Sequence, residues 1–400
     1  MSAADGQPSK PHVASQLSPN AMHAIRIASA ASIYSLRPSL SNRSRMLRMY
    51  RPSVSSLAAR AATILATTTL VVACSNGEAR AARPTVAATN AAADSTSTPV
   101  ASTSVAANGG ATGAGATAPT RAPNKMGRIP VLEYHLISDH DALYSRTREH
   151  FRADLEDAYR RGYRPITVSQ MLDKDFRDVP AGMSPIIVVF DDASPSQFSY
   201  IEKNGKLEID PTSGVGIWLD FAKSHPGWKN RGVFCMLNGG AAGHNFFGDN
   251  PKYGGQKKEW RFQKVQWLAQ QGFELCDHTV WHAMLSKYSD AVVQEQIARN
   301  AMGIDSAVPG YKIRSMALPY GLWPKNKSLA WQGEWTDPKT HQVHRYHFDA
   351  VMEVSGGPTR SPYDPQFDPH HITRIEAIGN DIQKVLDQLD KTNNRFVVGP

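Results

Sequence analysis

Short apolar runs alternate with amphipathic segments from residue 129 onward, and this alternation limits the fold more than any other feature of the chain. The run at residues 186–190, Ile-Ile-Val-Val-Phe, is apolar at every position, which is typical of a strand covered on both faces. Residues 150–162 instead carry apolar side chains at i, i+4, i+7 and i+8 and end in glycine, the pattern of an amphipathic helix. Buried strands that alternate with helices predict a parallel α/β fold.

The same alternation continues to the end of the chain. We expect strands at residues 129–135, 186–190, 232–237, 273–276, 316–318, 347–354, 372–375 and 396–398, and helices at residues 150–162, 262–271, 290–302 and 381–391. About seven strands with interleaved helices predict a barrel.

An insertion interrupts this pattern at residues 199–209, where Asn204-Gly205 separates two strand-like segments. Both residues tolerate positive φ, so the dipeptide predicts a tight hairpin. The hairpin follows the run at residues 186–190 closely. It could form a wall of a substrate groove, or it could be a surface decoration without a role.

The first 125 residues do not resemble a folded core, and they carry most of the chain's excess charge. The 400 residues include 44 Lys and Arg against 36 Asp and Glu, a net charge of +8. Twelve of those basic residues but only three of the acids lie in residues 1–125, so the remainder is close to neutral. The charge therefore gives no argument for nucleic-acid binding.

Residues 1–74 have the pattern of an upstream extension followed by a secretion signal. Arginines precede an apolar stretch at residues 61–73, which is too short to span a bilayer comfortably, and Val-Val-Ala-Cys follows. This resembles the lipobox of bacterial lipoproteins and makes Cys74 the expected lipidation site. An organellar transit peptide, or simple disorder, is the alternative. Residues 75–125, rich in Ala, Thr, Ser and Gly, predict a disordered linker to a domain at residues 126–400.

Acidic and imidazole side chains follow two of the expected strands. Asp191 and Asp192 end the apolar run, and His278 and His282 come directly after the strand at residues 273–276. The i, i+4 spacing of the histidines would place both rings on one side of a helical turn. Because parallel α/β folds collect chemistry at the carboxyl ends of their strands, these side chains predict a metal-dependent hydrolase site.

Three motifs in this order resemble the polysaccharide deacetylases with a NodB homology domain, carbohydrate esterase family 4. They are Val-Phe-Asp-Asp-Ala at residues 189–193, His-Thr-Val-Trp-His at residues 278–282 and Ala-Leu-Pro-Tyr-Gly at residues 317–321. The resemblance covers about residues 129–400. It implies a distorted (β/α)7-type barrel, preceded here by the disordered leader and linker.

The resemblance also implies roles for individual residues. Asp192, His278 and His282 would bind one divalent ion, most simply Zn²⁺, with Co²⁺, Ni²⁺ or Mn²⁺ as alternatives. Asp191 would be the general base, and the backbone N–H of Tyr320 would stabilise the oxyanion. Four aromatic side chains could contact sugar rings. They are Trp281 and Tyr320, next to the site in sequence, and Trp218 and Trp323.

Two departures from the family pattern concern the support of the base. Ala193 replaces the usual glycine, so the backbone there should avoid positive φ. Ala317 stands where many members carry an arginine that orients the base aspartate. Arg374, on a late expected strand, is our candidate for that role, and Arg314 is the second; a surface charge without a role is the alternative for Arg374.

The family's late Leu-x-x-His motif, which carries the general acid, is not evident. Tyr134-His135 ends the first expected strand and resembles the Tyr-His of members that deacetylate poly-N-acetylglucosamine, where that histidine is the acid. An imidazole suits proton donation near neutral pH. His135 is therefore the candidate acid and His371 the fallback, although a buried histidine bonded to a carbonyl would show the same pattern.

These features imply an extracytoplasmic hydrolase, lipid-anchored to a bacterial membrane. It would remove N-acetyl groups from a GlcNAc-containing polysaccharide such as poly-N-acetylglucosamine, a chitin-like polymer or peptidoglycan glycan. O-acetyl esterase activity on xylan-like glycans, hydrolysis of a small amide, and an inactive polysaccharide-binding domain remain alternatives.

No Gly-rich phosphate loop precedes a helix, so we expect no nucleotide partner. Cys235 and Cys276 could pair, but free buried cysteines are the commoner outcome.

Overall fold

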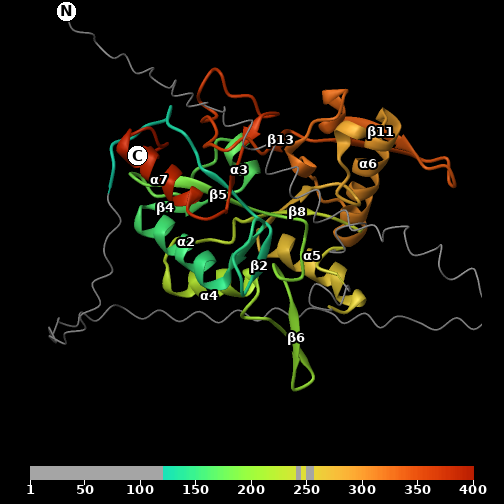
Figure 1. The fold of residues 1–400 in the computed structure, drawn as a ribbon, viewed down its shortest axis with the longest axis horizontal. Helices are drawn as coiled ribbons and strands as arrows, with labels where there is room; N and C mark the ends of the chain where they lie inside the picture. The colour runs from blue at the N-terminus through green and yellow to red at the C-terminus, as the bar shows by residue number, and fades with distance from the viewer. Residues whose placement is uncertain (1–119, 240–244, 249–255) are drawn as a thin grey trace, which may run out of the picture. The chain divides into compact units, whose positions relative to one another are not determined.

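A computed structural model of the chain describes residues 120–239, 245–248 and 256–400, which belong to one compact unit (Figure 1). Its main sheet follows the order β14-β13-β10-β9-β8-β5-β1-β15, with β4 attached to β5, and every pair is parallel. No helix in these residues is long and apolar enough to cross a membrane.

The sheet closes because its two ends belong to one short stretch of chain. β14 (Ile372–Thr373) pairs with β13 and β15 (Ile375–Glu376) pairs with β1, and only Arg374 separates them. The sheet therefore bends into a nearly closed barrel whose last strand changes partner at Arg374. This confirms the predicted barrel, including the strand at residues 372–375.

The other elements follow in chain order and agree with most of the predicted segments. The strands are β1 (Val131–Tyr134), β2 (Leu136–Ser138), β3 (Ser145–Thr147), β4 (Tyr163–Pro165), β5 (Ser184–Asp191), β6 (Tyr200–Lys203), β7 (Lys206–Ile209), β8 (Val233–Met236), β9 (Glu274–Asp277), β10 (Ser315–Ala317), β11 (Gln332–Thr336), β12 (Val343–His347) and β13 (Ala350–Glu353). The helices are α2 (Arg148–Arg160), α3 (Val168–Leu172), α4 (Gly214–Ser224), α5 (Arg261–Gln270), α6 (Asp290–Ala307) and α7 (Asp381–Lys391).

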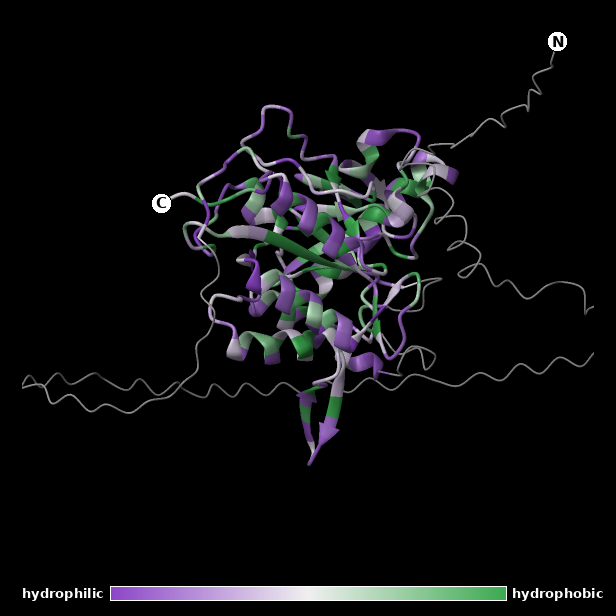
Figure 2. Cartoon of the chain, turned by 60° about the vertical axis from the view of Figure 1, so that its left-hand side comes forward, coloured by the Kyte–Doolittle hydropathy of each residue, from purple (hydrophilic) through white to green (hydrophobic). Residues whose placement is uncertain are grey.

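Side chains of the barrel strands alternate between two apolar clusters. The cluster that packs against the outer helices includes Leu132, Val188, Phe234, Leu275 and Met316. The second cluster includes Val131, Val189, Val233, Cys235, Cys276 and Ala317. Because the helices cover the first set, the second faces the barrel interior, and alternation places Glu133 and Asp191 on the same side. Figure 2 shows the corresponding division into apolar inner and polar outer surfaces.

Cys235 and Cys276 lie directly opposite each other on neighbouring strands β8 and β9 and form a disulfide. The sequence left this pairing open, and the structure has the disulfide instead of the commoner outcome of two free cysteines. Both sulfurs belong to the interior cluster, where the parallel register brings the two Cα atoms to 4.2 Å. Register between distant strands was not readable from the sequence, which left only the residue type as a guide.

The predicted hairpin at Asn204-Gly205 is confirmed. Asn204 and Gly205 have φ of 52° and 72°, and they join the antiparallel strands β6 and β7. The hairpin projects from the body of the domain, and most of its side chains are exposed (Figures 1 and 2).

Three parts of the fold differ from the predictions. Residues 396–398 form bridges but no strand of the barrel. Residues 332–347 form the antiparallel hairpin β11–β12, which was not predicted. Helix α4 was also missed because Gly214 and Gly216 lower its helix propensity. Gly216 is required there, since a Cβ would come within 2.1 Å of the carbonyl oxygen of Asp210.

Lys264 of α5 is fully buried, and its hydrogen-bond partners among the described residues are uncharged. Its Nζ donates to the carbonyl of Phe247 at 2.9 Å and to Oε1 of Gln256 at 2.8 Å. Burial lowers the pKa of Lys264 to about 7. The unfolded chain, in which the lysine has its ordinary pKa, therefore binds more protons than the folded chain between pH 7 and 10.

We expect the free energy of unfolding to rise with pH in that interval, by up to about 1.4 kcal/mol per pH unit from this group. Lys264→Met should reduce the slope, measured by urea unfolding at pH 7, 8.5 and 10. Lys258→Met changes an exposed lysine nearby and is the control, which should keep the wild-type slope. Equal slopes in the wild type and Lys264→Met would contradict the burial argument.

Candidate active site

Four segments that follow barrel strands meet at the carboxyl end of the barrel. His135 follows β1, Asp191 ends β5 and Asp192 follows it, residues 278–282 follow β9, and residues 319–321 follow β10. Parallel strands in one closed sheet have their carboxyl ends on one rim, so segments up to 190 residues apart in sequence become neighbours.

Asp192, His278 and His282 form a group with the donor atoms of a metal site. One ligand atom from each lies within 4.8 Å of the others. Asp192 Oδ1 is 3.5 Å from His278 Nε2 and 3.6 Å from His282 Nε2. Asp192 Oδ1 and His278 Nε2 are buried and have no hydrogen-bond partner within the part of the chain that the structure describes. Two such atoms facing one another fit a divalent cation between them, and two imidazoles with one carboxylate suit zinc.

The orientation of His278 supports this assignment. Its Nδ1 lies 2.8 Å from the carbonyl oxygen of Ala317, to which it can donate. The proton then stays on Nδ1, and the lone pair of Nε2 points toward Asp192. Strand β10 thus fixes the ring of a residue that follows β9.

The backbone of the histidine segment differs from the predicted helical turn. Thr279 and His282 have φ of 68° and 58°, and residues 278–282 form an irregular loop. Asp277 stabilises it by accepting the N–H of Thr279 at 2.9 Å. The two rings still meet, with centroids 4.9 Å apart. The i, i+4 spacing therefore predicted the proximity of the rings but the wrong conformation.

The expectation for Ala193 is also wrong. Ala193 has a φ of 49° and Asp192 one of 76°, so two successive non-glycine residues adopt the left-handed region. Tight packing holds this turn, since Ala193 is fully buried and its carbonyl accepts the N–H of Phe247 at 2.7 Å. The turn points the Asp192 carboxylate toward the two imidazoles. The strained backbone therefore serves to position a candidate metal ligand.

Asp191 lies beside the metal-ligand group but is bound to a different partner. Its Oδ2 accepts from Arg374 Nη1 at 2.7 Å and is 3.8 Å from His278 Nε2. Burial alone would raise the pKa of Asp191, but the charges of Arg374, His278 and His135 outweigh it and lower that pKa. The structure therefore places an ionised carboxylate, oriented by a buried guanidinium, next to the candidate ligands.

The electrostatic balance differs among the candidate ligands. Burial opposes ionisation of Asp192, but His282 and His278 lower its pKa well below the ordinary value. Burial lowers the pKa of His282 to about 4, despite the nearby charge of Asp192. His282 is thus a neutral imidazole beside an ionised carboxylate, the protonation state that metal binding requires. Burial would also lower the pKa of His278, but the charges of Asp191 and Asp192 outweigh it and raise that pKa instead.

His135 belongs to a second group, with Glu133 and Asp191, whose potential ligand atoms lie within 4.8 Å of one another. Its Nε2 is 3.6 Å from Oε1 of Glu133, and burial lowers its pKa despite the charges of Asp192 and Asp191. Gln197 ties the two segments together, because its Nε2 donates to the carbonyls of His135 at 2.6 Å and of Asp191 at 2.5 Å.

Tyr320 has a φ of 59°. Its ring lies beside the ring of His282, with centroids 4.4 Å apart and the two planes tilted by 58°. Trp281 lies between the two candidate ligand histidines and is half-buried. Both aromatic residues tied to the site by sequence thus remain near it.

Other candidates lie elsewhere. Arg314 pairs with Asp173 and Asp349, both at 2.6 Å, and not with Asp191. His371 lies 3.4 Å from Glu353 and beside the ring of Trp323. Trp218 is buried in the core and is not a sugar platform.

Glu133 was missed by the sequence reasoning, although it has the same inward direction as Asp191. It lies 3.3 Å from Arg374 Nη2, so one guanidinium bridges two buried carboxylates. Burial raises the pKa of Glu133 well above its usual range, although Arg374 opposes this. Its position two residues before His135, on the same side of a strand, was a signal that could have identified it.

Comparison with known proteins agrees with this geometry. Residues 233–332, which include β8, β9 and the loop with both candidate ligand histidines, match the family model described as polysaccharide deacetylase. Over these residues the chain is similar to the polysaccharide deacetylases, as the sequence motifs predict. Enzymes of that family are hydrolases. No curated protein matches the chain.

Solved structures similar to this chain have low sequence identity to it. A polysaccharide deacetylase from Bacillus anthracis, described as putative, shares 14% identity, with 65% of this chain and 69% of that chain covered and a TM-score of 0.44. The Streptococcus pyogenes deacetylase PplD, in complex with acetate, shares 14%, with 67% and 98% covered and a TM-score of 0.45. IcaB from Ammonifex degensii shares 16%, with 65% and 96% covered and a TM-score of 0.43.

Proposed function

We propose that this chain is a metal-dependent enzyme that removes N-acetyl groups from a GlcNAc-containing polysaccharide. The observation that carries the proposal is the pair of buried atoms, Asp192 Oδ1 and His278 Nε2, that face each other at 3.5 Å and have no hydrogen-bond partner among the described residues. His282 completes the ligand set. A bound divalent ion, most simply Zn²⁺, would acidify a water molecule and polarise the acetamide carbonyl.

Asp191 is the proposed general base, and the structure distinguishes its two oxygens. Oδ2 is held by Arg374, whereas Oδ1 is buried with no hydrogen-bond partner in the described part of the chain. Oδ1 is therefore the atom that takes the proton of the attacking water. Arg374 keeps the carboxylate ionised and fixes its direction.

His135, held near Glu133, is the proposed general acid that protonates the departing amine. The backbone N–H of Tyr320 stabilises the negative charge on the former carbonyl oxygen. Trp281 and Tyr320 provide apolar surface next to the reacting acetyl group. Acetate and a free amine on the sugar are the products.

Acetate release from N-acetylated chito-oligosaccharides tests the activity. The full chain, supplied with Zn²⁺ or Co²⁺, should release acetate, and a chelator should stop the release. Acetylated xylo-oligosaccharides run in parallel separate N- from O-deacetylation. If neither substrate yields acetate with any of the metals, the chain is at most a polysaccharide-binding domain, and the proposal is wrong.

We also propose that the enzyme is extracytoplasmic and lipid-anchored through Cys74, a residue outside those that the structure describes. The Cys235–Cys276 disulfide supports an oxidising compartment, where such bonds persist. Metabolic labelling with a radioactive fatty acid should mark the wild type and not Cys74→Ala, which should also leave the membrane fraction. An unlabelled wild type would contradict the anchor.

A further inference from the structure

A cavity of about 380 Å³ lies beside the loop that carries the candidate ligand histidines. Its lining includes Val280, which stands between His278 and His282 in sequence, together with Asn238, Arg299 and Trp335. Ligand cavities in proteins commonly measure roughly 300–1,000 Å³. The cavity is therefore large enough for a ligand, and it adjoins the site described above.

Helix α6 links this cavity to the site. Gln296 of α6 accepts the N–H of Trp281 at 3.3 Å, and Gln294 accepts the N–H of Glu334 in β11 at 3.1 Å. One helix thus holds both the histidine loop and the β11–β12 hairpin, and both segments contribute residues to the lining of the cavity. Figure 1 shows β11 beside α6. A ligand between helix and hairpin would keep a fixed position relative to Asp192 and the histidines.

The chemistry of the lining suits an uncharged polar ligand. The lining contains two acids, Glu295 and Asp337, and two bases, Arg299 and Lys339, so its charges balance. Arg299 and Glu295 form an ion pair at 2.7 Å. Trp335 adds an aromatic wall with a polar indole N–H. An aromatic surface surrounded by hydrogen-bonding groups without net charge favours a sugar over a polyanion.

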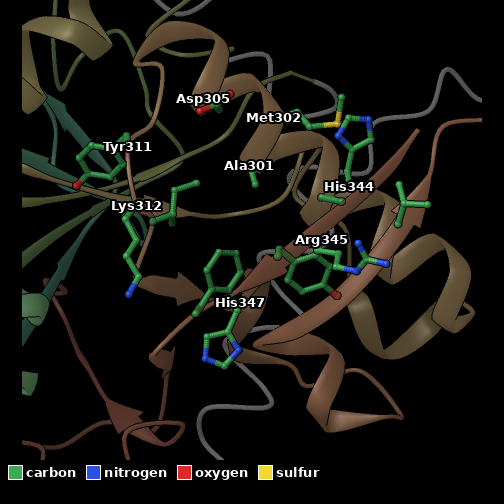
Figure 3. A pocket seen from close by; sticks show the side chains of 13 residues that line it. Ala301, Met302, Asp305, Tyr311, Lys312, His344, Arg345 and His347 are labelled. Atoms are coloured by element: carbon green, nitrogen blue, oxygen red, sulfur yellow. The ribbon is translucent and has the colours of Figure 1, made fainter. Parts of the chain in front are cut away.

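A second cavity of about 410 Å³ neighbours the first, and Met302 contributes to the lining of both. It lies between the carboxyl-terminal half of α6 and β12 (Figure 3). Trp335 of the first cavity and His344 of the second are directly opposed across the hairpin. Lys312 and Arg345 outnumber Asp305 in the second lining, so a ligand carrying ammonium groups is disfavoured there.

We infer that these two cavities form one groove that binds the N-acetylated polysaccharide strand next to the reacting unit. The choice of ligand rests on the proposed function. The acetylated strand is uncharged, whereas the deacetylated product carries ammonium groups that Lys312 and Arg345 would repel. The hairpin that builds one side spans residues 332–347, almost wholly beyond the part that matches the family model, so the groove goes beyond what that match covers.

Kinetics on substrates of different length test the groove. Trp335→Ala in the full chain should raise KM for the pentamer of N-acetylglucosamine about tenfold, because buried tryptophan contacts contribute much of the energy at binding sites. The kcat/KM for the dimer, which is too short to extend along the groove, should not change. Met302→Trp fills the junction of the two cavities and should have the same effect. Thr336→Ala changes the neighbouring hairpin residue, which does not line either cavity, and is the control.

Binding to the Asp192→Asn variant, followed by tryptophan fluorescence, separates the groove from the reaction. If Asp192→Asn binds the pentamer and the added Trp335→Ala substitution weakens that binding, the groove is supported. This holds even if the wild type releases no acetate, because the lack of acetate would contradict only the proposed function. Acetate release with equal pentamer KM in the wild type, Trp335→Ala and Met302→Trp overturns the groove and leaves the proposed function standing. Equal binding of the glucosamine pentamer overturns the preference for the acetylated strand.

Discussion

Replacing Asp192 with asparagine is expected to lower acetate release about a thousandfold and to remove the bound metal. Asp192 provides the carboxylate of the candidate ligand group, and its Oδ1 lies within 3.6 Å of both imidazole Nε2 atoms. Without that negative charge, two neutral imidazoles alone would hold a divalent ion weakly. A thousandfold loss corresponds to about 4 kcal/mol of transition-state stabilisation.

Asp191→Asn is the matched control, because it removes the same charge one residue away. Its carboxylate is bound to Arg374 and lies outside the candidate ligand group. This variant should keep its metal and still lose acetate release, since an amide cannot accept the proton of water. Metal content after dialysis, measured by mass spectrometry, and acetate release are read together. Full metal occupancy in Asp192→Asn, or metal loss in both variants, would contradict the division of roles.

The sequence predicts the parts of this site that depend on local pattern. The apolar run before Asp191 predicts a buried strand whose end carries the two carboxylates, and strand β5 ends at Asp191. The same reasoning places His278 after β9. Parallel strands have a fixed direction, so these local assignments already bring the four side chains to one rim.

The loop conformations were not predictable in the same way. Ala193, Thr279 and His282 adopt positive φ because surrounding contacts hold them there, and their residue types disfavour that conformation. Local propensity therefore gave the opposite expectation at Ala193 and a helical turn at His282. Both errors fall at the site itself, where a folded protein can maintain strained backbone for a positional purpose.

Partnerships between distant strands were only partly predictable. Arg374 was a candidate because it lies on a late strand, but its bridge to Glu133 depends on closure of the barrel between β14 and β15. The Cys235–Cys276 bond depends on the register of β8 against β9 in the same way. Neither register has a signal in a single sequence.

Arg374→Gln is expected to reduce both stability and turnover, because Arg374 is the buried cation that Asp191 and Glu133 share. Its side chain is fully buried, with contacts of 2.7 Å to Asp191 and 3.3 Å to Glu133. Removing one partner of a buried ion pair costs about 3–5 kcal/mol, since the remaining charges lose their compensation. Arg177→Gln, which alters an exposed arginine paired with Asp175, should leave the free energy of unfolding nearly unchanged, because water screens exposed ion pairs.

The second carboxylate provides a test of this shared pairing. If Arg374 offsets the repulsion between the carboxyl groups of Glu133 and Asp191, Glu133→Gln should recover part of the stability lost in Arg374→Gln. The double-mutant cycle should then give an interaction energy of about 0.5–3 kcal/mol. Turnover should recover less, because Asp191 still lacks the guanidinium that orients it, so kcat should stay low while KM changes little. Additive losses in the cycle would show that Glu133 and Arg374 act independently, and would remove Glu133 from the support of the base.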